Sequence, residues 1–117
     1  MKNATFWDSI KCAFSGMIYA MKTEKNFKYY FGIGIFFFIV NTLCRVELAY
    51  YIPYFIAAGG VFSTELINTA IEHAANVITK DICVEIKLIK DIAAGAVLFS
   101  GIVYFIVEFF IIGMRFL

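Results

Sequence analysis

The chain has 117 residues and a net charge of +1, which is enough length for one domain and too little positive charge to indicate a nucleic-acid-binding protein. Hydrophobic residues make up 62% of it and charged residues 16%, whereas a water-soluble domain is about half apolar and about one quarter charged. The composition therefore excludes an ordinary soluble protein and predicts a single membrane-embedded domain spanning residues 1–117. Its three cysteines are widely spaced and indicate neither a disulfide framework nor a zinc site.

The N-terminal segment, about residues 4–24, is predicted to form an amphipathic helix. Apolar side chains recur every three or four residues and would form one stripe along it: Phe6, Ile10, Phe14, Met17 and Met21. A helix of this kind usually lies on a membrane surface, although it could also pack on its own bundle.

Three apolar segments follow, at about residues 27–44, 48–78 and 91–115, and each is predicted to be a transmembrane helix. The second segment would reach roughly 45 Å at about 1.5 Å per residue, well beyond a hydrocarbon core of about 30 Å. Its polar second half must therefore lie at or beyond one membrane face. Pro53 lies early in this segment and is expected to bend it. We expect a polar connection, Thr79–Lys90, before the third span. The fold class is thus an all-α membrane protein.

The basic residues predict the orientation. With three spans, the N-terminal region and the polar connection lie on one side, which holds eight lysines: Lys2, Lys11, Lys22, Lys25, Lys28, Lys80, Lys87 and Lys90. Only Arg45 and Arg115 fall on the other side. Because loops rich in lysine and arginine stay in the cytoplasm, we expect a cytoplasmic N-terminus in a multi-pass protein of a cytoplasmic membrane.

A stripe of polar side chains on the second span is the strongest chemical signal. Helical spacing puts Glu65, Asn68, Glu72 and Asn76 on one face of a helix that is otherwise apolar. An ionisable residue inside a membrane is costly and usually functional. Two carboxylates with an amide between them suit a divalent metal ion, and a desolvated carboxylate suits a general base.

Two other functions would also use a polar stripe. It could hold helices together in a structural membrane subunit, which would tolerate Glu65→Gln. It could also serve a small oligomeric proton-coupled transporter, in which Glu65 or Glu108 carries the proton. The transporter requires a carboxylate near the membrane centre, whereas the length of the second span places Glu65 toward the cytoplasmic face.

Two segments resemble a known family. Residues 65–72 (ELINTAIE) and 90–98 (KDIAAGAVL) are similar to the signatures of the prokaryotic diacylglycerol kinase and undecaprenol kinase family. Residues 22–27 (KTEKNF) extend the resemblance toward the N-terminus. The resemblance implies a homotrimeric helical bundle that phosphorylates a membrane lipid alcohol with ATP and Mg²⁺ at the cytoplasmic membrane surface.

The same resemblance implies a role for each site residue. Glu65 would be the catalytic base and Asn68 would help to order the site. Glu24 and Glu72 would hold Mg²⁺ that bridges the phosphates of ATP. Lys90 would contact phosphate, and Asp91 would lie on the nucleotide side of the site.

The chain departs from the family pattern at Asn76, at Glu108 and in the N-terminal helix, where Cys12 and Asp8 stand in place of the usual tyrosine or basic residues. Asn76 replaces the usual aspartate, so it can bond to ribose or water but adds no charge near the metal. Glu108, in the outer half of the third span, is expected to reach the outer face or to pair with Arg115. The residue 23–27 segment is more similar to the undecaprenol kinase branch, so undecaprenol is the favoured substrate and diacylglycerol the alternative.

Overall fold

The computed structural model describes residues 5–81 and 83–117, which form four α-helices and one short 3₁₀ turn. The all-helical class is therefore as predicted. Helix α1 is Phe6–Thr23, α2 is Asn26–Leu43, α3 is Tyr51–Ile78 and α4 is Val84–Phe116. The turn, η1, is Leu48–Tyr50. Lys2 and the expected start of the first helix at residue 4 lie outside the described residues.

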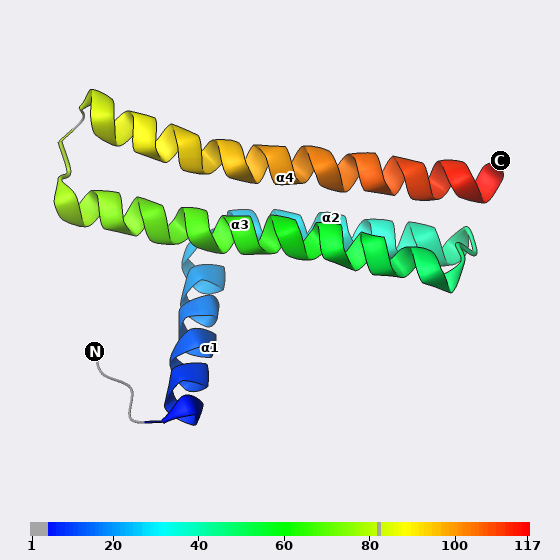
Figure 1. The fold of residues 1–117 in the computed structure, drawn as a ribbon, viewed down its shortest axis with the longest axis horizontal. Helices are drawn as coiled ribbons and strands as arrows, with labels where there is room; N and C mark the ends of the chain where they lie inside the picture. Colours follow the sequence, from blue (N-terminus) through cyan, green and yellow to red (C-terminus); the bar gives the residue numbers. More distant parts are fainter. Residues whose placement is uncertain (1–4, 82) are drawn as a thin grey trace.

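The two longest helices, α3 and α4, pack side by side and antiparallel, and α2 lies alongside α3 (Figure 1). Helix α1 runs nearly perpendicular to the other three and contacts α3 (Figure 1). The molecule is consequently flat, with extents of 52 × 40 × 19 Å. This arrangement brings the junction between α1 and α2 against the polar half of α3.

Helix α1 begins where its sequence supplies a cap. The Thr5 side chain accepts a hydrogen bond of 3.1 Å from the backbone N–H of Asp8, and the Asp8 carboxylate lies in the first turn, where it complements the helix dipole. Pro53 falls within the first turn of α3, where no backbone hydrogen bond is lost. The expected bend at this proline therefore has no physical cause.

The polar connection is shorter than the sequence indicates. It was expected to reach Lys90, but α4 already begins at Val84. Glu85 lies in the first turn of α4, and Lys87 forms an ion pair of 2.7 Å with Asp91 one turn later. Charged residues at this spacing stabilise a helix. Polarity alone does not distinguish such a helix from a loop, so it placed the start of α4 too late.

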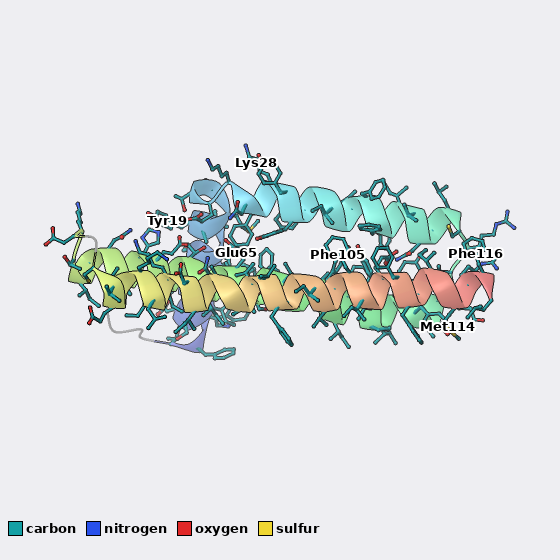
Figure 2. All side chains as sticks on the ribbon, turned by 90° about the horizontal axis from the view of Figure 1, so that it is seen from above. Tyr19, Lys28, Glu65, Phe105, Met114 and Phe116 are labelled. Carbon is teal, nitrogen blue, oxygen red and sulfur yellow. The ribbon has the colours of Figure 1, made fainter. Side chains whose placement is uncertain are left out.

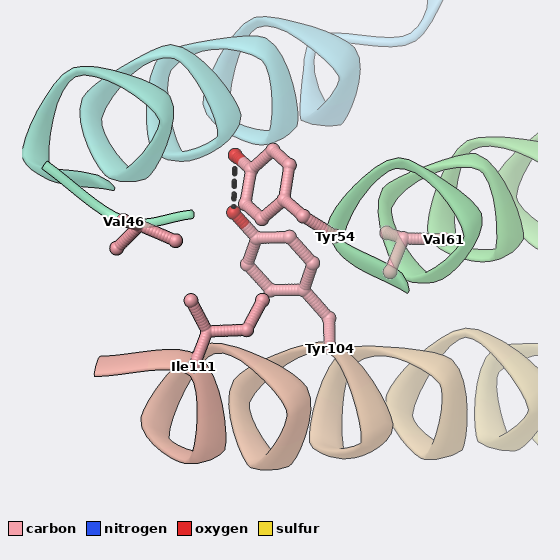
Figure 3. Close-up of a cluster of buried hydrophobic side chains, with 5 residues drawn as sticks. All are labelled: Val46, Tyr54, Val61, Tyr104 and Ile111. Carbon is pink, nitrogen blue, oxygen red and sulfur yellow. Dashed lines mark hydrogen bonds between the residues drawn. The ribbon is translucent and has the colours of Figure 1, made fainter. Parts of the chain in front are cut away.

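The buried core lies in the half of the bundle that contains the α2–α3 turn. Figure 3 shows its five buried side chains: Val46, Tyr54, Val61, Tyr104 and Ile111. The Tyr104 hydroxyl lies 2.9 Å from the Tyr54 hydroxyl (Figure 3), which in turn donates to the Gly34 carbonyl of α2. The tyrosines thus join three helices through apolar rings with a polar end.

The exterior of the bundle is far more apolar than that of a soluble protein. Large apolar groups face outward, among them Phe36, Phe55 and Phe109, which are 59%, 56% and 68% exposed. Two carboxylates are buried within the bundle, since Glu65 is 1% and Glu108 0% exposed. Among the described residues, one helix, α4, is long and apolar enough to cross a membrane. An apolar exterior with carboxylates enclosed inside the bundle fits a chain surrounded by hydrocarbon.

Glu108 was expected to reach the outer face or to pair with Arg115, and it does neither. Its carboxylate is buried between α2 and α4, where Oε1 accepts a hydrogen bond of 2.9 Å from Asn41 Nδ2. Arg115 is not its partner, because the guanidinium donates to the Cys44 carbonyl at 2.7 Å. Asn41 satisfies part of the carboxylate inside the bundle, so Glu108 does not reach the outer face.

The turn after α2 stores backbone strain. The Val46 N–H bonds to the Asn41 carbonyl and the Arg45 N–H to that of Thr42, both at 3.1 Å, which is the pattern of a Schellman motif. Its left-handed position is usually glycine but here is Arg45, with φ 57°.

Arg45→Gly should raise the free energy of unfolding by up to about 1 kcal/mol. Glycine removes roughly 1–2 kcal/mol of left-handed strain, and the more flexible unfolded chain offsets about 0.5–1 kcal/mol of that gain. Thermal unfolding in detergent measures the change. Arg45→Ala is the control, because it keeps the strain; equal gains in both variants would contradict the interpretation.

Candidate active site

The candidate site is built around Glu65, which lies near the middle of α3. Its side chain is 1% exposed and its Oε1 has no hydrogen-bond partner among the described residues. Figure 2 shows Glu65 close to the place where α1 meets α2. A buried carboxylate oxygen without a donor is costly and therefore points to a group that acts on a ligand.

The α1–α2 junction is held against α3 by aromatic rings. Phe27, at the start of α2, is 1% exposed and packs edge-on against Phe62, with ring centroids 5.2 Å apart. Phe31, one turn further along α2, lies 5.6 Å from the same ring. On the other side of the junction, Tyr19 of α1 packs against His73 of α3 at 5.7 Å. These contacts fix both ends of the junction to the helix that carries Glu65.

The junction surrounds Glu65 with polar groups. The charges of Glu24, which caps the C-terminus of α1, and of Glu72 both act on the Glu65 carboxylate. Asn26 and Tyr30 of α2 are hydrogen-bonding neighbours of the same carboxylate. A buried carboxylate with two half-buried carboxylates beside it forms a negatively charged site.

The polar stripe of α3 is formed as the helical spacing predicts. Asn68 is 7% exposed, and its Nδ2 donates to Glu72 Oε1 at 3.4 Å. Its Oδ1 is buried and has no hydrogen-bond partner in the described part of the chain. Glu65 and Asn68 therefore each keep one oxygen free to accept a hydrogen bond from a bound molecule.

Lys90 and Asn76 are joined across the α3–α4 interface. Lys90 Nζ donates to Asn76 Oδ1 at 3.0 Å. The lysine therefore bonds to an uncharged amide oxygen of the stripe. Asp91 takes a different partner, since it accepts from Lys87 on the exposed side of α4. Lys90 thus extends the stripe toward α4, while Asp91 lies beside it on the solvent side.

Two neighbours of Glu65 were absent from the sequence prediction. Asn26 and Tyr30 are four residues apart on α2 and so share one helix face. Asn26 lies within the residue 22–27 segment that resembles the family, and this membership was the signal that could have identified it. The pairing of Lys87 with Asp91 was also readable from the i, i+4 spacing.

A groove of about 350 Å³ lies between α1 and α3. Its lining is mostly apolar and consists of Ala13, Gly16, Met17, Tyr19, Ala20, Leu66, Thr69, Ala70 and His73. Thr69 and Leu66 belong to the same turns of α3 as Glu65 and Asn68. An apolar groove therefore runs next to the polar stripe.

The chain matches the prokaryotic diacylglycerol kinase family over residues 11–112. It is 36% identical over 92 residues to an undecaprenol kinase from Bacillus subtilis (strain 168), covering 79% of this chain and 75% of that protein. It is 31% identical over 100 residues to a diacylglycerol kinase from Synechocystis sp. (strain ATCC 27184 / PCC 6803 / Kazusa), covering 85% of this chain and 57% of that protein. No solved structure matches the chain.

Glu65→Gln should stabilise the protein by about 1 kcal/mol, because it removes a buried carboxylate that Glu24 and Glu72 repel. The change would appear as a rise of a few degrees in the thermal midpoint in detergent. The matched control is Glu47→Gln, at an exposed glutamate, which should leave the midpoint unchanged. A less stable Glu65→Gln variant would instead indicate that the carboxylate supports the fold.

Proposed function

The chain belongs to the prokaryotic diacylglycerol kinase family, and we propose that it transfers the γ-phosphate of ATP to the hydroxyl of undecaprenol, with diacylglycerol as the alternative substrate. Membership makes it a membrane lipid kinase that uses ATP, as the resemblance predicted. The higher identity with the undecaprenol kinase and the residue 23–27 segment support undecaprenol. The similarity to the diacylglycerol kinase from Synechocystis supports diacylglycerol as the alternative.

One observation carries the catalytic proposal: Glu65 is buried and keeps Oε1 free. A carboxylate in this state can accept the proton of the lipid hydroxyl as its oxygen attacks phosphorus. Asn68, whose Oδ1 is also free, would orient the hydroxyl or a phosphate-bound water. The groove between α1 and α3 offers apolar walls to the lipid chain beside these two residues.

The acidic neighbours fit a divalent ion delivered with the nucleotide. Mg²⁺ in phosphoryl-transfer sites is usually held by one or two carboxylates together with substrate phosphates. In the described part of the chain, no group of three or more His, Cys, Asp and Glu side chains could hold an ion alone. Glu24 and Glu72 would supply the two carboxylates, and the ion would neutralise charge on the phosphates.

The remaining residues would bind and position the nucleotide. Lys90, which now bonds to Asn76, carries a positive charge that can move to a phosphate oxygen. Asn76 would then be free to bond to ribose or water. Asp91 would lie on the nucleotide side, adjacent to Lys87. Because phosphoryl transfer needs mainly positioning and charge neutralisation, this set is chemically sufficient without a glycine-rich loop.

We also propose the membrane arrangement and assembly of the enzyme. Three spans, about 27–44, 48–78 and 91–115, would cross a bacterial cytoplasmic membrane, with the helix at about 4–24 on the cytoplasmic surface. The outward-facing apolar side chains of α2, α3 and α4 support this placement. Residues 1–117 would act as one domain within a homotrimer whose copies pack through part of these faces.

Purified protein in detergent should phosphorylate a lipid alcohol when supplied with labelled ATP and Mg²⁺. Glu65→Gln should lower the rate by about 10²–10⁴-fold, the usual contribution of a general base, while nucleotide binding stays close to wild type. Glu47→Gln should keep full activity. Full activity in Glu65→Gln would exclude the assigned role, and no transfer by well-folded wild-type protein would exclude the kinase proposal for these two lipids.

Undecaprenol should be phosphorylated faster than diacylglycerol in the same micelles. Measuring kcat/KM for each lipid under identical detergent and Mg²⁺ concentrations gives the ratio directly. A ratio in favour of diacylglycerol would leave the reaction class intact and reverse the substrate assignment.

Glu72→Gln should increase the Mg²⁺ concentration needed for half-maximal rate by about tenfold or more, because one of two proposed carboxylate ligands is lost. A Mg²⁺ titration of the initial rate at saturating ATP measures this. An unchanged titration curve would contradict the assignment of Glu72 as a metal ligand.

A further inference from the structure

A second buried carboxylate, Glu108, lies in the other half of the bundle and takes no part in the proposed reaction. Its side chain is 0% exposed, and Asn41, which bonds to it from α2, is 1% exposed. Asn41 Nδ2 donates to Glu108 Oε1 at 2.9 Å. The other two oxygens of the pair, Asn41 Oδ1 and Glu108 Oε2, have no hydrogen-bond partner among the described residues.

An ionised Glu108 would be poorly compensated in this position. Asn41 gives it one neutral donor, whereas a buried carboxylate requires a cation or several donors to offset its desolvation. Arg115, the cation nearest to it along α4, donates to the Cys44 carbonyl instead. The side chains that face Glu108 from α3 and α4 include Tyr54 and Tyr104, whose hydroxyls are already bonded to one another.

A proton on Glu108 would account for both unpartnered oxygens. The pair as it stands has one donor group and an excess of acceptors, so two acceptors are left without a donor. Protonation turns Oε2 into an O–H donor, and Asn41 Oδ1 is the free acceptor on its partner. A carboxylic acid and a carboxamide are both planar and can form two parallel hydrogen bonds.

We propose that Glu108 is an uncharged carboxylic acid which joins α2 to α4 through a double hydrogen bond with Asn41. Phe37 of α2 also packs against Tyr104 and Phe105 of α4, with ring centroids 6.2 and 5.8 Å apart, and the Asn41–Glu108 pair adds a polar link between the same helices. The pair would hold the far end of α2, while Phe27 and Phe62 hold the end at the candidate active site.

Infrared difference spectroscopy of the full-length protein in detergent at neutral pH tests the protonation state directly. The wild-type minus Glu108→Gln spectrum should contain the carbonyl band of a protonated carboxyl group. The wild-type minus Glu47→Gln spectrum, from an exposed glutamate, should contain carboxylate bands. Carboxylate bands in the Glu108 difference spectrum would overturn the proposal and indicate an ionised group with a bound cation or water.

Thermal unfolding tests the double hydrogen bond. Glutamine has the shape of the neutral acid, and its amide offers one donor and one acceptor to Asn41. Glu108→Gln should therefore unfold within about 2 °C of wild type. Glu108→Ala and Asn41→Ala should each unfold several degrees lower, and the double variant little lower than either one. A Glu108→Gln midpoint as low as that of Asn41→Ala, or fully additive losses, would overturn the proposal. If the alanine variants fail to fold, a Glu108→Gln midpoint more than about 2 °C below that of wild type overturns the proposal by itself.

Discussion

The edge-on packing of Phe27 against Phe62 holds the start of α2 on the middle of α3, and the candidate site depends on it. Glu24 and Asn26 belong to the short segment just before Phe27, so the aromatic contact brings them to Glu65. The residues between α1 and α2 are too few to move independently of it. An apolar contact therefore determines where the polar groups meet.

The buried polar groups fall into two sets, one near each end of α2. Near the α2–α3 turn, the hydroxyls of Tyr54 and Tyr104 and the Asn41–Glu108 pair connect helices to one another. Near the α1–α2 junction, Glu65 and Asn68 also keep free oxygens, and the charges of Glu24 and Glu72 act on Glu65. A proton on Glu108 would supply the donor that the first set lacks. Glu65 and Asn68 instead lie beside the groove between α1 and α3, so the second set is the one expected to meet a substrate.

Helical spacing was sufficient to predict the stripe of Glu65, Asn68 and Glu72, because one turn of helix fixes which side chains share a face. It could not predict the contacts between helices, such as Asn26 with Glu65 or Asn41 with Glu108, since these depend on which faces pack together. The early start of α4 was missed for another reason. Lys87 and Asp91, four residues apart, stabilise the first turns of α4. A prediction from hydropathy alone assigns such a charged segment to a loop.

Helix α4 is continuous from Val84 to Phe116, and this continuity has a geometric consequence. Lys90 and Glu108 lie on the same rigid rod, about 27 Å apart along its axis at about 1.5 Å per residue. Glu108 is buried and so fixes the position of α4 along the bundle. The number of residues between Lys90 and Glu108 then sets how far Lys90 lies from the buried pair along the helix axis. Inserting one residue between them would raise Lys90 by about 1.5 Å and rotate it by about 100°, away from Asn76.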